Sequence, residues 1–407
     1  MAEPVTKRRR WFSFSLRAML LALTAFGVAL GWWANSAHRQ RAIVLELELE
    51  MEADDPFSRV DLVYDYADSS DTNTATGHGR HYLRSPAPRR GVLVQRRLAP
   101  GHVGVFLPTQ YAASQVPPAV LRFFGKDFFH NVTAVELRSS AADDVLEKVS
   151  RLPHIQTLII ETDQPVTEVG MRHLARLRRM KRLRIDNAVN LGEESFRILG
   201  RLSRLEMLEL QDAHPTDEDL DQLSNLKSLK LLRLSETQKP GRQPEIRVHR
   251  LALLGPLTNL EELWLPPVNI DKSGVQHLLT LRNLTTLEIP NSEITDEDVK
   301  LLLGHETLDF LSLRRCRIDG SGFRDAPASS VLQWLNLSNT EIVDASIPYL
   351  ARLPNLAGLN LKRTQVTAKA LEQLKSCPTL RYLNVDRFVE ADLKRLRQAL
   401  PGCTVQY

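Results

Sequence analysis

A repeat of fixed period is the feature that most constrains the fold of this chain. Six segments begin with leucine at positions 260, 284, 308, 332, 356 and 380, so the period of 24 never slips. They read LEELWLPPVNI, LTTLEIPNSEI, LDFLSLRRCRI, LQWLNLSNTEI, LAGLNLKRTQV and LRYLNV. A fixed period of this length is typical of a solenoid, in which each unit packs only on its neighbours.

Each unit combines a strand pattern with a helix pattern. Leucines at the fourth and sixth places, such as Leu335 and Leu337, alternate with polar residues and predict a short strand with one buried face. The ninth place is small, as at Ser292 and Cys316, where we expect a turn against the next unit. Apolar residues then recur three and four apart, which predicts a helix. One unit cannot bury both faces alone, so the units must stack.

These units resemble leucine-rich repeats. The helix openings TDED at 216–219 and ITDE at 294–297 resemble those of the ribonuclease-inhibitor-like subclass. The resemblance covers about residues 130–407 and implies an α/β solenoid, a right-handed horseshoe of about eleven units with a parallel concave sheet and convex helices. The first five units are looser, and they begin near Val132, Ile155, Met180, Leu205 and Leu229.

An uncharged segment, residues 18–34, precedes the repeats. As a helix it would span about 25 Å, enough for a thin membrane crossing, and Trp32 and Trp33 close it like interfacial aromatic residues. Five Lys and Arg residues precede it and only Arg39 and Arg41 follow closely, so the positive-inside rule places the N-terminus in the cytoplasm and the repeats outside. The alternatives are a signal peptide cleaved near Ala34 and a buried soluble helix.

The region between this anchor and the repeats has fewer signals. Residues 38–55 favour a short stalk helix, and residues 60–66 favour a strand. With the segment PPAVLRFFGKDFFHNV, this arrangement resembles bacterial membrane-anchored leucine-rich-repeat proteins, in which that segment is an N-terminal cap. Its phenylalanines are predicted to cover the first repeat, with a binding groove as the alternative.

The predicted organisation has six parts. They are a basic cytoplasmic tail (1–17), a transmembrane anchor (18–34), a stalk and small α+β region with a flexible loop (35–116), the N-terminal cap (117–131), the repeats (132–386) and a C-terminal cap (387–407). The step between the units at Leu229 and Leu260 is longer than the others and contains a Pro-rich basic loop, 235–250. We interpret this loop as a tolerated insertion or as a contact for an acidic partner.

No catalytic, cofactor or metal motif is present in the sequence. It lacks HExxH, GxxxxGK[ST], GxSxG and GxGxxG patterns, and its three cysteines are too far apart for a CxxC site. The net charge of +4 is small and the two signs are interspersed, which argues against a nucleic-acid surface. We therefore predict a non-enzymatic protein without a cofactor or a metal.

The concave face is the predicted binding surface. The third, fifth and seventh residues of a unit point away from the core, and equal places stack in columns because neighbouring strands lie about 4.8 Å apart. The N-terminal half is charged there, whereas the C-terminal half combines an aromatic column with an asparagine column. The predicted partner-binding residues are Trp264, Phe310, Trp334, Asn336, Asn360, Tyr382 and Asn384. In the alternative interpretation, these asparagines form hydrogen-bonded ladders that only stabilise the sheet.

The sequence thus predicts a single-pass bacterial envelope protein whose concave face recognises an unknown protein. Rigid extended surfaces suit macromolecules better than small substrates. Two alternatives stay open: a structural envelope scaffold or spacer without a specific ligand, and an enzyme with an unrecognised site in residues 55–131.

Overall fold

The computed structural model describes residues 16–54, 59–64, 131–138, 142–235, 251–268 and 272–407. The chain forms two compact units, one of residues 1–48 and 63–132 and one of residues 49–62 and 133–407. The basic loop beyond Ser235 and the cap segment before Asn131 lie outside the described residues, as does most of the region in which an enzyme site was considered.

One parallel sheet runs through the repeats. Strands β2 to β13 pair in parallel and in chain order, and β1 stands first in that order. The strands are β1 (Arg59–Tyr64), β2 (Val132–Arg138), β3 (Thr157–Ile160), β4 (Arg182–Ile185), β5 (Met207–Gln211), β6 (Leu231–Ser235), β7 (Glu262–Trp264), β8 (Thr286–Glu288), β9 (Phe310–Ser312), β10 (Trp334–Asn336), β11 (Gly358–Asn360), β12 (Tyr382–Asn384) and β13 (Thr404–Gln406).

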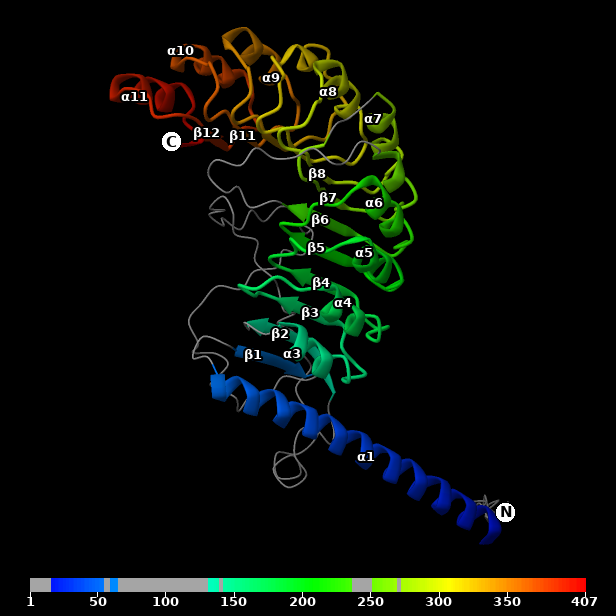
Figure 1. Ribbon diagram of the computed structural model, residues 1–407. Coiled ribbons are helices and arrows are strands. Elements are labelled where there is room, and N and C mark those ends of the chain that lie inside the picture. Colours follow the sequence, from blue (N-terminus) through cyan, green and yellow to red (C-terminus); the bar gives the residue numbers. More distant parts are fainter. Residues whose placement is uncertain (1–15, 55–58, 65–130, 139–141, 236–250, 269–271) are drawn as a thin grey trace, which may run out of the picture. The chain divides into compact units, whose positions relative to one another are not determined.

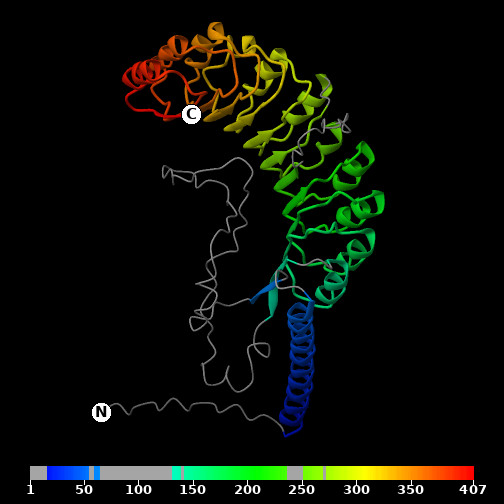
Figure 2. The ribbon, with the colours of Figure 1, turned by 60° about the vertical axis from the view of Figure 1, so that its left-hand side comes forward.

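In residues 133–407, helices cover one face of this sheet (Figures 1 and 2). The α-helices of the repeats are α3 (Ala142–Val149), α4 (Glu168–Leu174), α5 (Glu193–Gly200), α6 (Asp217–Leu223), α7 (Lys272–Leu278), α8 (Asp296–Leu302), α9 (Ile347–Leu350), α10 (Ala368–Leu371) and α11 (Glu390–Ala399). The 3-10 helices are η2 (Leu251–Leu254), η3 (Ser321–Phe323), η4 (Asp344–Ser346) and η5 (Glu372–Ser376).

The core lies between the sheet and the helices. The fourth-place leucines face one another in register, so Leu335 stands opposite Leu311 and Leu359, and each of the three is at most 3% exposed. Larger side chains fill the helix side, where Phe196 and Phe323 are buried. The predicted solenoid of stacked strands and helices is thereby confirmed, with eleven repeat strands from β2 to β12.

Each repeat turns sharply after its strand. The eighth place of the unit adopts a left-handed backbone, with φ of 50° at Asn291, 62° at Arg315, 59° at Asn339 and 55° at Arg363. Asparagine tolerates this conformation better than arginine does. The ninth-place residue then turns inward; the Thr340 hydroxyl donates to the Leu337 carbonyl, and Cys316 is buried as its place in the unit predicts.

Carboxylate side chains at the helix starts form hydrogen bonds that link neighbouring repeats. The side chain of Asp296, in the first turn of α8, accepts hydrogen bonds from the backbone N–H groups of Asp319 at 3.0 Å, Gly320 at 3.0 Å and Gly322 at 2.9 Å. The same link recurs between Asp344 and the Thr367 N–H, at 2.7 Å. These bonds satisfy backbone donors that the next helical turn leaves unpaired.

Replacing Asp296 by alanine is expected to lower the free energy of unfolding by about 1–3 kcal/mol, because three backbone donors lose their acceptor. Urea denaturation followed by circular dichroism measures this change. Glu297→Ala is the matched control, because Glu297 is exposed and this substitution removes the same charge from the same turn of the helix. Its effect should stay below about 1 kcal/mol. Equal losses for the two variants would contradict the role of the Asp296 bonds.

The predictions for the N-terminal region agree with the structure only in part. The stalk is helical as expected, but it continues the preceding apolar segment as one helix, α1 (Leu16–Asp54). None of the helices in the described part of the chain combines the length and the apolar character that a membrane span requires. The strand predicted at 60–66 corresponds to β1 (Arg59–Tyr64), with residues 65 and 66 outside the described residues, and the segment predicted as the C-terminal cap (387–407) contains α11 and β13.

Candidate partner-binding face

The side of the sheet that faces away from the helices, here the strand face, carries the predicted columns. Register places Phe310, Trp334, Gly358 and Tyr382 in one row across β9 to β12. A second row contains Ser312, Asn336, Asn360 and Asn384. The seven predicted binding residues, here the aromatic–asparagine patch, are all half-buried, as expected for side chains on an open sheet face.

Two aromatic contacts organise this patch. The rings of Trp334 and Tyr382 stack with centroids 5.4 Å apart and an interplanar angle of 23°. Gly358 lies between them, and a Cβ atom there would approach the Trp334 ring to 2.1 Å. The stack therefore requires glycine on the intervening strand. Trp264 and Phe310 form a looser pair with centroids 5.8 Å apart.

The asparagines do not form the ladder of the alternative interpretation. The Asn336 Oδ1 atom accepts from the Ser338 N–H, and the Asn360 Oδ1 atom accepts from the Lys362 N–H, both at 3.1 Å. Each side chain therefore closes the turn of its own repeat. The Asn384 Oδ1 atom is buried and finds no hydrogen-bond donor among the described residues. Within the described part of the chain, the Nδ2 donors of Asn336 and Asn360 have no hydrogen-bond acceptor.

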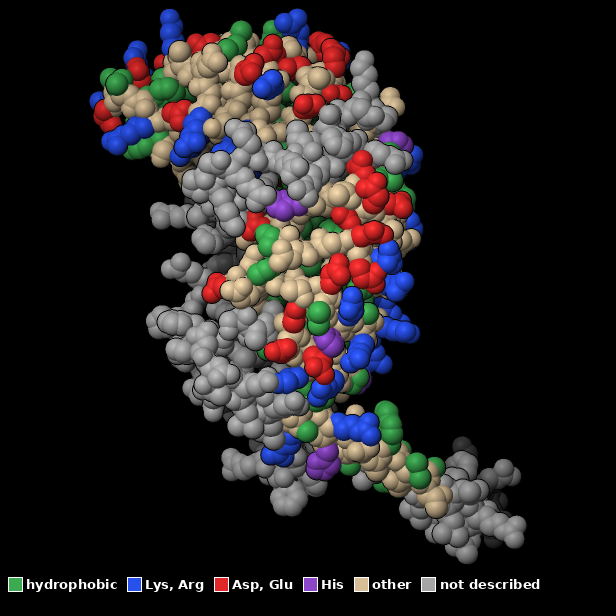
Figure 3. Space-filling model, in the orientation of Figure 1, with side chains coloured by type: hydrophobic (Ala, Val, Ile, Leu, Met, Phe, Trp, Pro, Cys, Tyr) green, Lys and Arg blue, Asp and Glu red, His purple; other side chains and the backbone are tan. Residues whose placement is uncertain are grey.

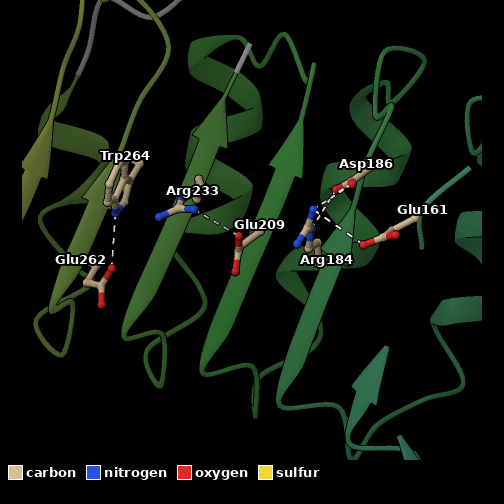
Figure 4. Close-up of polar contacts among 7 residues, drawn as sticks. All are labelled: Glu161, Arg184, Asp186, Glu209, Arg233, Glu262 and Trp264. Atoms are coloured by element: carbon tan, nitrogen blue, oxygen red, sulfur yellow. Dashed lines mark hydrogen bonds and ion pairs between the residues drawn. The ribbon is translucent and has the colours of Figure 1, made fainter. Parts of the chain in front are cut away.

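The N-terminal half of the strand face is a row of ion pairs (Figure 4). The Arg184 guanidinium donates from Nε to the Asp186 carboxylate at 2.8 Å and lies 3.9 Å from Glu161. The Arg233 Nη1 atom lies 3.6 Å from the Glu209 carboxylate, and both side chains are less than one-tenth exposed. Buried pairs of this kind contribute little net stability, although losing one partner is costly.

Arg233 connects the charged half to the aromatic half. Its guanidinium lies over the Trp264 ring, 4.0 Å from the ring centre. The Trp264 indole N–H in turn donates to the Glu262 carboxylate at 3.4 Å, as Figure 4 shows. Among the described residues, the Nε and Nη1 atoms of Arg233 have no hydrogen-bond acceptor. A cation–π contact and a long ion pair therefore hold this arginine in place.

Three carboxyl groups around Arg233 are shifted towards the protonated form. Burial raises the pKa of Glu209, Glu262 and Glu288, although the Arg233 charge acts in the opposite direction on each of them. For Glu262, the hydrogen bond from Trp264 also lowers the pKa, yet burial outweighs both effects.

The pKa of Glu262 predicts a pH dependence of stability. Because the folded state holds the proton more tightly than the unfolded chain, whose carboxyl has the ordinary pKa of 4.5, the unfolding free energy should fall as the pH rises above that value. Glu262→Gln removes this titration and keeps an acceptor for Trp264. Urea midpoints measured from about pH 4 to about pH 7 should therefore fall more in the wild type than in the variant. Parallel profiles would contradict the assignment.

The described residues hold no group of three His, Cys, Asp or Glu side chains that is placed to bind a metal ion. Burial raises the pKa of the Cys316 thiol to about 11 and that of Cys403 to about 11, so neither is a thiolate at neutral pH.

No protein-family profile matches this chain, and no curated protein does. Solved structures that match include an internalin of Listeria monocytogenes, with 16% identity over 71% of this chain and 92% of that chain and a TM-score of 0.45. The complex of Rad7 and Elc1 from yeast matches with 20% identity over 66% of this chain and 75% of that chain, at a TM-score of 0.47. A plant peptide hormone receptor, RGFR1 in complex with RGF2, matches with 14% identity over 66% of this chain and 49% of that chain, at a TM-score of 0.39.

The sequence pattern and the architecture agree on the class of protein. The regularly recurring leucines are the buried residues of successive parallel strands, and one helical or 3-10 segment separates most of these strands. With this repeat and this ladder of strands, the chain has the fold of a leucine-rich-repeat solenoid.

Proposed function

We propose that this protein recognises another protein through the aromatic–asparagine patch. The observation that supports this most directly is the stack of Trp334 and Tyr382 over Gly358. Large rings held rigidly on an open face lose little conformational freedom on binding, which is why aromatic residues dominate the energetics of protein interfaces.

The neighbouring groups fit a protein ligand as well. The amide donors of Asn336 and Asn360 stand one row away from the ring stack and suit the carbonyl groups of a peptide backbone. The face is long and its polar groups are spread over many strands, an arrangement that suits an extended partner better than a small molecule.

Photo-crosslinking in intact cells tests this proposal. A benzophenone amino acid in place of Tyr382 retains an aromatic ring on the strand face, and the same residue in place of Leu301, which is 45% exposed on α8, probes the helix side. Mass spectrometry of the adducts should identify a protein captured from Tyr382 and not from Leu301. The same adducts at both positions, or none at Tyr382, would favour the scaffold or spacer function.

We also propose that residues 18–34 anchor the protein in a membrane, with the repeats on the extracytoplasmic side. Support comes from the uncharged sequence and from apolar side chains that face solvent on α1: Phe26 is 64% exposed, Val28 74% and Trp32 73%. Exposed rings and branched chains on one helix are expected to seek an apolar environment.

Fractionation of cells that express the full chain tests this anchor. The protein should stay with the membranes after an alkaline carbonate wash, and Val28→Lys should weaken its retention because a charge is costly in the bilayer core. A protease added from outside should digest the repeats when the extracytoplasmic side of the membrane is accessible to it, and should leave them intact when that side is closed off. A shorter soluble form that begins near Ala37 would contradict the anchor and indicate a cleaved signal peptide.

A further inference from the structure

A cationic surface lies on one edge of the solenoid, where the helices of three consecutive repeats end and the next strands begin. It consists of eight exposed side chains, here the basic edge: Arg176, Arg178, Arg179, Lys181, Arg201, Arg204, Lys227 and Lys230. Figure 3 shows Lys and Arg side chains gathered along the margin beside α4 and α5. The small net charge of the whole chain conceals this local concentration.

The backbone holds these loops side by side. The Glu206 N–H donates to the Lys181 carbonyl at 2.7 Å, and the Lys230 N–H donates to the Glu206 carbonyl at 2.8 Å. Residues one repeat apart in sequence, such as Arg179 and Arg204, therefore come from adjacent loops. The positive charges are brought together by the repeat itself and sit on rigid strand starts.

The protein neutralises only part of this edge. Lys181 lies 3.3 Å from Glu206, and Lys230 lies 3.4 Å from Glu261. Four arginines form no ion pair within the described residues: Arg176, Arg178, Arg201 and Arg204. Crowded like charges oppose folding, so an external anion has a favourable interaction to gain at this edge.

A hollow of about 630 Å³ marks the centre of the edge. It is lined by Gln156, Arg178, Arg179, Lys181, Ser203 and Arg204. Each of these side chains offers hydrogen-bond donors, and none is a carboxylate or an aromatic ring. The Arg179 guanidinium lies 2.7 Å from the His154 Nδ1 atom, which holds it at the rim. The hollow is therefore chemically suited to an anion that accepts several hydrogen bonds.

We infer that the basic edge binds an acidic segment of a protein, with carboxylate or phosphorylated side chains seated in the hollow. Guanidinium groups bind such anions in a bidentate manner, and arginines outnumber lysines here. The edge offers no aromatic ring for stacking bases and no projecting helix or ribbon to enter a nucleic-acid groove, which favours a protein over a nucleic acid.

Fluorescence anisotropy on the full chain in mild detergent tests this inference. The probes are a labelled peptide of alternating Glu and Ser residues and the same peptide with phosphoserines. We expect both to bind at low salt, and the double variant Arg178→Ala and Arg204→Ala to weaken binding by about tenfold or more. A difference between the two probes identifies which anion the hollow prefers.

The matched control removes two exposed cations elsewhere, Arg352→Ala with Lys375→Ala, and should change affinity by about twofold at most. Equal losses in the two double variants would overturn the inference. So would tighter binding of a single-stranded DNA of equal charge, or of phosphatidylglycerol vesicles. Variants of the aromatic–asparagine patch should leave peptide binding unchanged, so this test is independent of the proposed strand-face function.

Discussion

Replacing Trp334 and Tyr382 together by alanine should weaken binding of the native partner by about a hundredfold or more. Aromatic anchors at the centre of an interface commonly contribute about 2 kcal/mol or more each. The fold should tolerate the change, because both rings are half-buried on the strand face and their stacking contributes only about 0.5–1.5 kcal/mol. Calorimetric titration with the crosslinked partner measures the affinity, and thermal unfolding measures the stability.

Gly358→Ala provides a second test without removing a ring. Its Cβ atom would clash with the Trp334 indole and displace it from Tyr382, so binding should weaken in the same direction but by less. Gly402→Ala is the matched control, because a Cβ atom there meets nothing within 4 Å. If the double ring variant binds as tightly as the wild type, the patch is not the interface.

Phe196→Ala should produce the largest loss of stability, about 3–5 kcal/mol. The ring is fully buried in α5, and its removal leaves a cavity that the neighbouring helices cannot close. Because repeats of a solenoid contact only their neighbours, the weakening should be concentrated in the adjacent units. Urea unfolding gives the overall change, and hydrogen exchange shows where protection is lost.

Val169→Ala is the control for Phe196→Ala. This side chain lies on the adjacent helix, α4, and is 54% exposed, so its truncation should change stability by about 0.5 kcal/mol at most. Unaltered exchange in the repeats around Phe196, or a loss spread evenly over all repeats, would contradict the local picture of stability.

Much of the fold follows from the leucine spacing alone. Leu311, Leu335 and Leu359 hold the same place in three successive units, and the structure aligns them in register, so the columns of the strand face were predictable too. The left-handed turn at Arg315 was not predictable, because arginine in a sequence does not indicate a backbone with positive φ. The repeat after β9 has only a 3-10 turn, η3, in a segment that contains Gly320, Gly322 and Pro327, and the repeat after β10 begins with the 3-10 turn η4 before the short helix α9.

The site was predictable in position but not in its contacts. The sequence placed Trp334 and Tyr382 on one face, but the stack of their rings depends on the absence of a Cβ atom at Gly358. The basic edge escaped detection because its charges come from loops of different repeats, and composition averages them with the carboxylates of the helix starts. Only the stacked backbone reveals such a cluster.

The last strand of the ladder bears on how separate molecules meet. Among the described strands, β13 pairs only with β12, and it is short. An unpaired edge invites docking of another copy and, if repeated head to tail, growth of a fibre. The guanidinium groups of Arg387 and Arg397 lie 5.7 Å and 5.8 Å from the Tyr407 ring, next to this edge. The short length of β13 and the nearby positive charges are features that protect a sheet edge against such docking.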